Sequence, residues 1–427
     1  MKNIGNDIYA LAQRLFPLHR SITGNGTRKT LHILQEEVPH LTLHEVPSGT
    51  RAFDWTVPQE WNIKDAYILA PTGEKIVDFQ ESNLHVVGYS TPINKTIPLE
   101  ELQKHLYSLP DQPNAIPYIT SYYKKRWGFC LTDNQRQGLK PGEYRVVIDS
   151  ELKDGSLTYG EIILPGSVEK EVFLSTYVCH PSMANNELSG PTVTIFLAKW
   201  LLSQKRKYTY RIIFIPETIG SIVYLSRNIQ EMQKNIIAGF NITCVGDDKA
   251  YSFLPSRSGN TLADRVARHV LKHAHPEFHA YTYLERGSDE RQYCSPGVDL
   301  PVASIMRSKY GVYPEYHTSL DNLDFISPAG LQGAYEVLQK SIECIEADEV
   351  LQTTVLCEPQ LGKRGLYPTI STKKSNAMVR DMMNLIAYAD GTRSLLEIAE
   401  KIQVPMWELI PLAQKLKTEN VLRVSSQ

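Results

Sequence analysis

The chain has 427 residues, and its 45 Lys and Arg against 47 Asp and Glu give a formal net charge of −2 at pH 7. A chain of this length has room for a large α/β domain plus smaller units, and its near-neutral charge excludes a general attraction to nucleic acid or anionic membranes. Its start lacks the apolar core of a signal peptide, and no segment has spanning length. Its six cysteines are scattered without a CxxC pair, which indicates free thiols in a reducing compartment. We therefore predict a cytoplasmic protein without membrane contact.

The first 133 residues divide into two stretches of different composition. Residues 1–46 predict a helix from residue 4, a polar turn at 21–27, and a second helix that ends near residue 37. Residues 47–133 are rich in proline, aromatic and turn residues, with short β-like runs between them. We expect 1–46 to be the N-terminal part of a peptidase-like domain and 47–133 to be an inserted β-rich domain.

Strands and helices alternate over residues 134–360, which predicts an α/β fold with a mostly parallel sheet sandwiched by helices. The reactive residues of such sheets lie beyond the carboxyl ends of the strands, and His180 and Glu217 each follow a predicted strand. The expected strands are 144–148, 157–163, 171–178, 208–215, 239–245 and 302–306, and the expected helices begin near 189, 221, 262 and 328.

Residues 361–427 predict a separate small domain, which resembles a winged helix in its three short helices and terminal strand. A capping box at 394–397 opens the second helix. The third helix has apolar residues where a DNA reader needs polar ones, so we do not expect nucleic-acid binding. We expect this helix to pack on the catalytic domain or on a second subunit, and we expect a homo-oligomer.

Three motifs lie at intervals along the peptidase-like stretch: STYVCHPSMANNELSG at 175–190, IPETIGS at 215–221, and YHT at 316–318 with Asp321 behind it. In order and spacing they resemble the metal-binding segments of the co-catalytic zinc aminopeptidases, the family of aminopeptidase Y and glutamate carboxypeptidase. The resemblance implies that His180 and His317 bind metal, that Asn186 occupies the position of a bridging aspartate, and that Glu217 is the general base.

A narrower resemblance covers the whole chain. Its motifs are FDWTVP at 53–58, LHVVGYS at 84–90, SYY at 121–123, WGFC at 127–130, GSDERQY at 287–293 and YPEYHTSLD at 313–321. They are similar to a family of bacterial aminopeptidase-like proteins with an inserted β domain and a C-terminal winged helix. Members are often encoded near surface-polysaccharide or secondary-metabolite genes.

The chain departs from the zinc aminopeptidases at charged positions. Asn186 stands at the bridging position, Thr218 replaces the second Glu of a Glu-Glu pair, and Thr243 aligns with the remaining carboxylate ligand. His180 is also followed by Pro181-Ser182 instead of the x-Asp whose carboxylate orients the histidine. Because two adjacent cations need a bridging carboxylate, we expect one zinc rather than two. His180 and His317 would hold it with Asn186 or a nearby carboxylate, Glu187 being one candidate to replace the bridge.

Further candidates surround these ligands. We expect Tyr316 to act in catalysis, since its hydroxyl is suited to polarising a carbonyl. The expected substrate contacts are Asp289, Glu290, Arg291, Arg307 and Tyr313, with Arg291 or Arg307 able to hold a carboxylate. Each residue also has a plainer interpretation: a structural histidine at a strand end, a glutamate that caps the next helix, or a solvated loop at 289–291.

The favoured interpretation is a metal-dependent hydrolase that acts on an amide or peptide-like bond of a small substrate. Zinc would activate the attacking water, and Glu217 would accept its proton and pass it to the leaving amine. Two alternatives stay open at this point. The fold could bind a ligand without hydrolysing it, as the lost acidic ligands suggest, or the winged helix could make the chain a DNA-binding regulator.

Overall fold

The computed structural model describes residues 4–366 and 373–425. The chain forms two compact units: Met1–Gly259 with His279–Tyr335, and Asn260–Phe278 with Glu336–Gln427. None of the helices in the described ranges has the length and hydropathy that crossing a bilayer requires.

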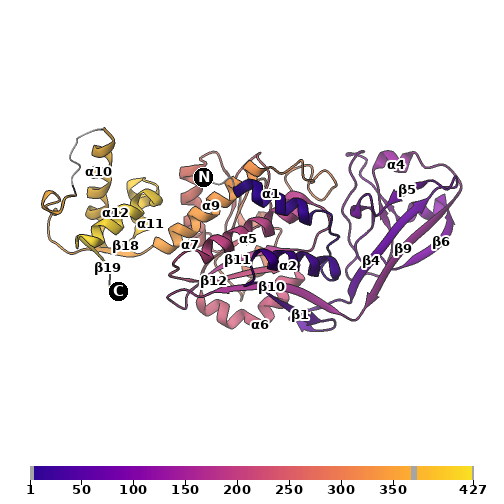
Figure 1. Ribbon diagram of the computed structural model, residues 1–427, viewed down its shortest axis with the longest axis horizontal. Coiled ribbons are helices and arrows are strands. Elements are labelled where there is room, and N and C mark those ends of the chain that lie inside the picture. The colour runs from indigo at the N-terminus through magenta and orange to yellow at the C-terminus, as the bar shows by residue number, and fades with distance from the viewer. Residues whose placement is uncertain (1–3, 367–372, 426–427) are drawn as a thin grey trace. The chain divides into compact units, whose positions relative to one another are not determined.

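An eight-stranded mixed sheet forms the centre of the first unit, in the order β1-β10-β12-β11-β13-β16-β14-β15. Figure 1 labels four of these strands, β1, β10, β12 and β11. Its four central strands β12, β11, β13 and β16 are parallel, and β10 and β14 pair with them in the antiparallel sense. The α/β fold class is therefore confirmed. The bounds are β1 (Thr42–Pro47), β10 (Ser156–Leu164), β11 (Glu171–Tyr177), β12 (Thr209–Ile215), β13 (Ile236–Asn241), β14 (Ser252–Leu254), β15 (His279–Ala280) and β16 (Val302–Met306).

Helices cover both faces of this sheet. The connection from β11 to β12 through α5 (Ser189–Leu202) runs one way across the sheet, and the connection from β12 to β13 through α6 (Ile219–Asn235) runs the other way. Right-handed crossovers in opposite directions place their helices on opposite faces, as Figure 1 shows for α5 and α6. The carboxyl ends of β11 and β12 thus lie where the two connections diverge, which is where ligands bind in open α/β sheets.

Other helices complete the first unit. Helix α1 (Ile4–Leu15) packs against α5, and α2 (Asn25–Glu37) packs against β10. The short α8 (Glu290–Tyr293) lies between α6 and β16. All seven residues of β11 are buried, as expected for a strand covered on both faces.

A second, antiparallel sheet in the order β5-β4-β9-β6 joins three strands of the insertion to β9, which follows it in the chain. Its strands are β4 (Glu60–Leu69), β5 (Lys75–Asp78), β6 (Ile93–Pro98) and β9 (Glu143–Lys153). Residues 144–148 were expected in the catalytic sheet, but β9 pairs with β4 and β6 instead. The exposure of β9 largely alternates, as in an antiparallel strand with one buried face. Such alternation predicts a strand, but it does not determine which sheet the strand joins. Smaller elements are β2 (Arg51–Ala52), β3 (Trp55–Thr56), β7 (Leu106–Tyr107), β8 (Phe129–Cys130), α3 (Leu99–Leu102) and α4 (Asp133–Gln137).

The second unit contains the expected winged helix. Strand β17 (Val350–Thr353) pairs with both β18 (Asp390–Ser394) and β19 (Leu422–Val424). Its helices are α7 (Leu262–Ala274), α10 (Lys373–Tyr388), α11 (Leu395–Ile402) and α12 (Met406–Thr418), and α9 (Pro328–Ala347) crosses the division between the units. Because β17 precedes residue 361, we propose that the winged-helix domain begins near residue 349.

Within this unit α12 packs on α7. The backbone N–H of Met406 donates to Nε2 of His269 over 2.9 Å. The ring of Trp407 lies 6.2 Å from the rings of both His269 and His273. The helix whose N-terminal residues would read a DNA groove is therefore covered there by protein.

Candidate active site

The register of two neighbouring parallel strands brings His180 and Glu217 together. Strands β11 and β12 end at Tyr177 and Ile215, and the chain continues the pairing with a 2.7 Å bond from the N–H of Val178 to the carbonyl of Ile215. Nε2 of His180 then lies 3.6 Å from Oε2 of Glu217. Burial raises the pKa of Glu217 above its usual value, against the lowering effect of His180 and Arg291. A carboxyl group with a raised pKa is suited to general acid–base catalysis.

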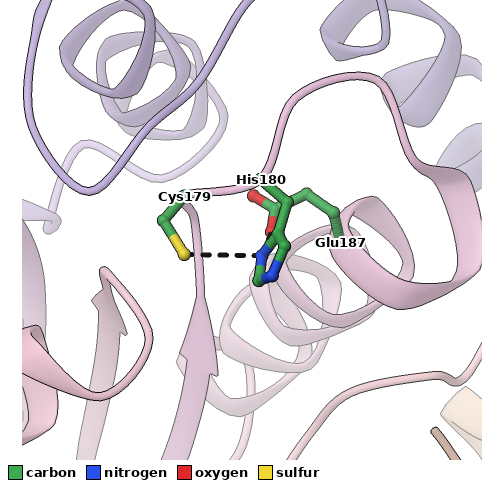
Figure 2. Close-up of side chains that lie close together, drawn as sticks. All are labelled: Cys179, His180 and Glu187. Atoms are coloured by element: carbon green, nitrogen blue, oxygen red, sulfur yellow. Dashed lines mark hydrogen bonds and ion pairs between the residues drawn. The ribbon is translucent and has the colours of Figure 1, made fainter. Parts of the chain in front are cut away.

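Glu187 orients His180 from the other side of the ring. Its Oε2 lies 3.0 Å from Nδ1 of His180, and Figure 2 shows the two side chains beside each other. Burial alone would lower the pKa of His180, but the hydrogen bond and charge of Glu187 raise it overall. Glu187 thus supplies the orienting carboxylate that the sequence lacks two residues after His180, and it leaves Nε2 directed to Glu217.

Arg20 holds this arrangement in place. Its guanidinium lies 3.3 Å from Oε1 of Glu187, and both side chains are fully buried. Its Nε donates to the carbonyl of His180 over 2.9 Å, and its Nη2 donates to the carbonyl of Pro181 over 3.2 Å. The N-terminal segment of the chain therefore fixes both the backbone and the ring of His180.

Cys179, His180 and Glu187 place possible ligand atoms within 4.8 Å of one another. Figure 2 shows the three side chains together. However, Sγ of Cys179 and Oε2 of Glu187 both approach Nδ1 of His180. A nucleophilic triad needs the thiol and the acid on opposite ring nitrogens, and burial raises the pKa of the Cys179 thiol well above its usual value. These contacts favour a positioning role for the cluster over a nucleophile.

His317 presents an open ring nitrogen beside His180. The two ring centres are 5.5 Å apart, and Nε2 of His317 is buried without a hydrogen-bond partner among the described residues. Burial, with the charge of His180, lowers the pKa of His317 to about 3, so the imidazole is neutral and able to bind a metal. Its φ of 57° is in the left-handed region, which costs about 1–3 kcal/mol in a residue with a side chain and is found preferentially at functional sites.

Neutral groups join the two positions that lack the expected carboxylates. The Tyr177 hydroxyl donates to Oδ1 of Asn186 over 3.1 Å and lies 2.6 Å from Oγ1 of Thr243. Nδ2 of Asn186 is buried and finds no partner in the described part of the chain. Asp321 fixes the loop by accepting the backbone N–H groups of residues 184–186. Asn186 is therefore held rigidly, with one amide atom bonded and the other open.

The start of α6 gathers Thr218, Asp289 and Arg291. Oδ1 of Asp289 accepts the backbone N–H of Thr218 over 2.8 Å, and Nη2 of Arg291 donates to the Thr218 hydroxyl over 2.6 Å. Burial and the charge of Glu217 raise the pKa of Asp289 to about 7. Asp289 thus caps a helix N-terminus, whereas Arg291 keeps Nε without a protein partner in the described ranges. Of these residues, Arg291 is the one with a donor to offer a substrate.

Glu290 and Tyr313 are occupied inside the protein. Glu290 is fully buried and accepts from Gly287, Ser288, Tyr310 and Asn241. The Tyr313 hydroxyl donates to Oδ2 of Asp321 over 3.1 Å. These contacts make both residues supports of the site loops, and we do not retain them as substrate contacts.

Arg307 and Tyr316 differ in their surroundings. The guanidinium of Arg307 stacks 3.9 Å from the ring centre of Tyr251, and none of its described contacts is with His180, Glu217 or His317. The ring of Tyr316 stacks 3.9 Å from that of His317. Burial, followed by the charge of Glu217, raises the pKa of Tyr316, so its hydroxyl stays protonated near the reactive carboxylate. Tyr316 therefore lies beside the candidate metal ligand His317, whereas Arg307 has no described contact with His180, Glu217 or His317.

The insertion contributes a residue that sequence reasoning missed. The ring of Tyr118 lies 5.1 Å from that of His180 and 5.2 Å from that of His317. The backbone N–H of Tyr118 donates to the carbonyl of His317 over 2.9 Å, next to a β-bridge between Pro117 and Thr318. Aromatic enrichment of 47–133 was visible in the sequence, but nothing local to Tyr118 assigned it to the site.

Comparisons with known proteins agree with this architecture. Residues 9–348 match the family described as a domain of unknown function (DUF4910), and residues 349–424 match a winged helix-turn-helix family. A Clostridium acetobutylicum protein is 48% identical over 399 residues, which cover 93% of this chain and 91% of that protein. It is described as a candidate polysaccharide biosynthesis protein with an aminopeptidase-like domain. The chain belongs to the DUF4910 family.

Solved structures extend the likeness of this DUF4910 chain. The crystal structure of a candidate peptidase from Clostridium acetobutylicum has a TM-score of 0.93 at 45% identity, over 99% of this chain and 96% of that one. A zinc aminopeptidase from Bacillus subtilis has a TM-score of 0.58 at 14% identity, over 80% of this chain and 94% of that one. The second likeness shows an aminopeptidase-like fold. The sequence resemblance to bacterial aminopeptidase-like proteins with a C-terminal winged helix is thereby confirmed.

Proposed function

We propose that this protein is a metal-dependent hydrolase of the aminopeptidase type that cleaves an amide or peptide-like bond of a small substrate. The observation that carries the proposal is the open Nε2 of His317 beside His180, whose own Nε2 is directed to the partly buried Glu217. Two imidazoles are ligands that catalytic zinc sites use, and a carboxylate beside them suits the general base. The aminopeptidase-like fold supports the same reaction class.

The spacing of the two histidines fits one metal. Two imidazoles on one tetrahedral zinc place their ring centres about 5 Å apart, because each nitrogen lies about 2.0–2.1 Å from the ion. The rings of His180 and His317 are 5.5 Å apart. Asn186 would complete the set through Oδ1, the amide atom that can bind a metal, in place of the bond that it accepts from Tyr177. The neutral side chains of Asn186 and Thr243 favour one ion over two. Zinc, when bound, supplies Lewis-acid activation of a water and of the substrate carbonyl.

The residues of the chain divide the remaining work. Glu217 accepts a proton from the attacking water and returns it to the leaving amine. The Tyr316 hydroxyl donates to the carbonyl oxygen as negative charge develops on it. Arg291, with its open Nε, donates a hydrogen bond to an oxygen of the substrate. Tyr118 covers the two histidines and limits the access of water.

Glu217→Gln tests this assignment. We expect hydrolysis of alaninamide by the zinc-loaded protein to fall by about 10²–10⁴-fold, the range for loss of a general base. Zinc content, measured by elemental analysis after removal of free ion, should be substoichiometric but specific in the wild type and should disappear in His317→Ala. A protein without zinc-dependent turnover and without a specific zinc site would exclude the proposal.

A ligand-binding protein on a degenerate peptidase fold is the second candidate, because Asn186 and Thr243 are neutral where anionic ligands are expected. Ligand binding that does not depend on zinc, together with the absence of turnover, would favour it. A DNA-binding regulator is not proposed, since α12 packs on α7 through Met406.

A further inference from the structure

Two exposed aromatic side chains, Trp55 and Tyr123, form a patch on the first unit, which we name the aromatic rim. Their exposed fractions are 39% and 57%, and Phe53, two residues before Trp55, is 53% exposed. The rings of Trp55 and Tyr123 are 5.8 Å apart, and the Tyr123 hydroxyl donates to the carbonyl of Thr56 over 3.2 Å. Clustered exposed aromatic side chains indicate a binding surface, whereas single ones do not.

Two tyrosines, Tyr118 and Tyr122, link the aromatic rim to the candidate active site. Tyr123 follows Tyr122, whose hydroxyl lies 2.8 Å from that of Tyr118. Tyr118 in turn contacts the rings of both His180 and His317. Tyr122 also lies within electrostatic range of Glu217, whose charge contributes to raising the pKa of Tyr122 after burial and the Cys179 thiol. A substrate seated at Glu217 would therefore project past Tyr118 and Tyr122 toward the rim.

Resting on the function proposed above, we propose that the aromatic rim is a sugar-binding subsite and that the substrate is an aminoacyl group in amide linkage to an amino sugar. The C–H face of a sugar ring packs on an aromatic ring while its hydroxyls stay in water, which suits Trp55 and Tyr123 at the surface. The relative described as acting in polysaccharide biosynthesis is consistent with this class of ligand.

The chemistry balances for such a substrate. Water adds its oxygen to the acyl carbon, the C–N bond breaks, and Glu217 carries the proton from the water to the nitrogen. The products are a free amino acid and an amino sugar with its amine restored. An aminopeptidase-type site holds the acyl part inside, so the sugar is the leaving group on the solvent side, where the aromatic rim lies.

N-alanyl-glucosamine and alaninamide, supplied to the zinc-loaded protein, test the assignment. Trp55→Ala should lower kcat/KM for N-alanyl-glucosamine by about 2- to 12-fold, the range that an aromatic contact provides, and Trp55→Phe should restore most of it. Alaninamide has no sugar, so its kcat/KM should change by less than about 2-fold. Val168→Ala, at an apolar side chain that is 40% exposed on the β10–β11 turn, is the matched control and should change neither.

Binding is measured separately by saturation-transfer NMR with glucosamine on the metal-free protein. Trp55-dependent transfer without any hydrolysis would support the sugar subsite while excluding the hydrolase. Hydrolysis of alaninamide with no sugar binding, or an equal loss on both substrates in Trp55→Ala, would overturn the subsite and leave the hydrolase standing. A change of oligomeric state in Trp55→Ala, with sugar selectivity unchanged, would identify the rim as a contact between copies and also overturn the subsite.

Discussion

The buried pair of Arg20 and Glu187 gives the most direct stability prediction. The Arg20 guanidinium is bonded to the carbonyls of Leu15, His180 and Pro181 besides its 3.3 Å contact with Glu187. Arg20→Met would leave the Glu187 carboxylate buried without its cation and three carbonyls without donors. Removing one partner of a buried ion pair costs about 3–5 kcal/mol of the free energy of unfolding. Glu187→Gln should cost less, because the carbonyls continue to accept from Arg20.

A double variant separates the charge effect from packing. Arg20→Met with Glu187→Gln removes both charges, so we expect it to be more stable than the sum of the single changes by about 2–3 kcal/mol. The free energy of unfolding of each variant is measured by urea unfolding, with tryptophan fluorescence as the signal. Of the five tryptophans only Trp407 lies in the second unit, so a Trp407→Phe background confines the signal to the first.

If each single substitution changes the free energy of unfolding by less than about 1 kcal/mol, as for an exposed pair, and the effects add in the double variant, then the pair does not hold the His180 loop. Measurements in the presence of a chelator keep bound metal from contributing.

Three further predictions concern the metal site, the packing of α5 and the winged helix. Asn186→Asp should raise the zinc bound per chain, because it restores an anionic ligand, and an unchanged zinc content would contradict this. Gly190→Ala should cost about 1–3 kcal/mol, since its Cβ would lie 2.4 Å from Oγ1 of Thr176, whereas Gly138→Ala, with nearest atoms at 3.4 Å, serves as the tolerated control in thermal unfolding. Burial lowers the pKa of His269 to about 4, so the unfolded chain binds the proton first as pH falls. The stabilisation by neutral His269 is therefore present above about pH 6.5, and about 2–3 kcal/mol of it is lost as the pH falls toward 4. Hydrogen exchange at the Met406 amide, corrected for its intrinsic rate, should show this loss of protection in the wild type. His269→Gln, which has no titrating group at this position, should not show it.

The sequence predicted the elements that carry the reactive groups because those signals are local. An apolar, β-branched run followed by Cys179-His180, and another followed by Pro216-Glu217, indicate two strand ends without any knowledge of the fold. Adjacent parallel strands in register then bring the two side chains together. The winged helix was visible for the same reason, since its capping box lies within four residues.

The partners of His180 could not be predicted in this way. Glu187 reaches the ring because residues 184–188 form a π-helical turn, and Arg20 arrives from 160 positions away. Tyr118 depends on a bridge between the insertion and the loop of His317. Neutral residues at the expected carboxylate positions predict a loss of charge, but the Tyr177 hydroxyl that joins two of them is known only from the fold.

The pairing of strand β9 determines which residues can be deleted to isolate the catalytic sheet. It pairs with β4 and β6 and continues through two residues into β10 of the central sheet. Excising 47–133, the span that composition suggests, would leave β9 with both its edges unpaired and its apolar face in water. Such a ribbon is a template for intermolecular pairing. A deletion intended to isolate the catalytic sheet should end at Gly155 instead, and one ending at residue 133 should yield aggregates.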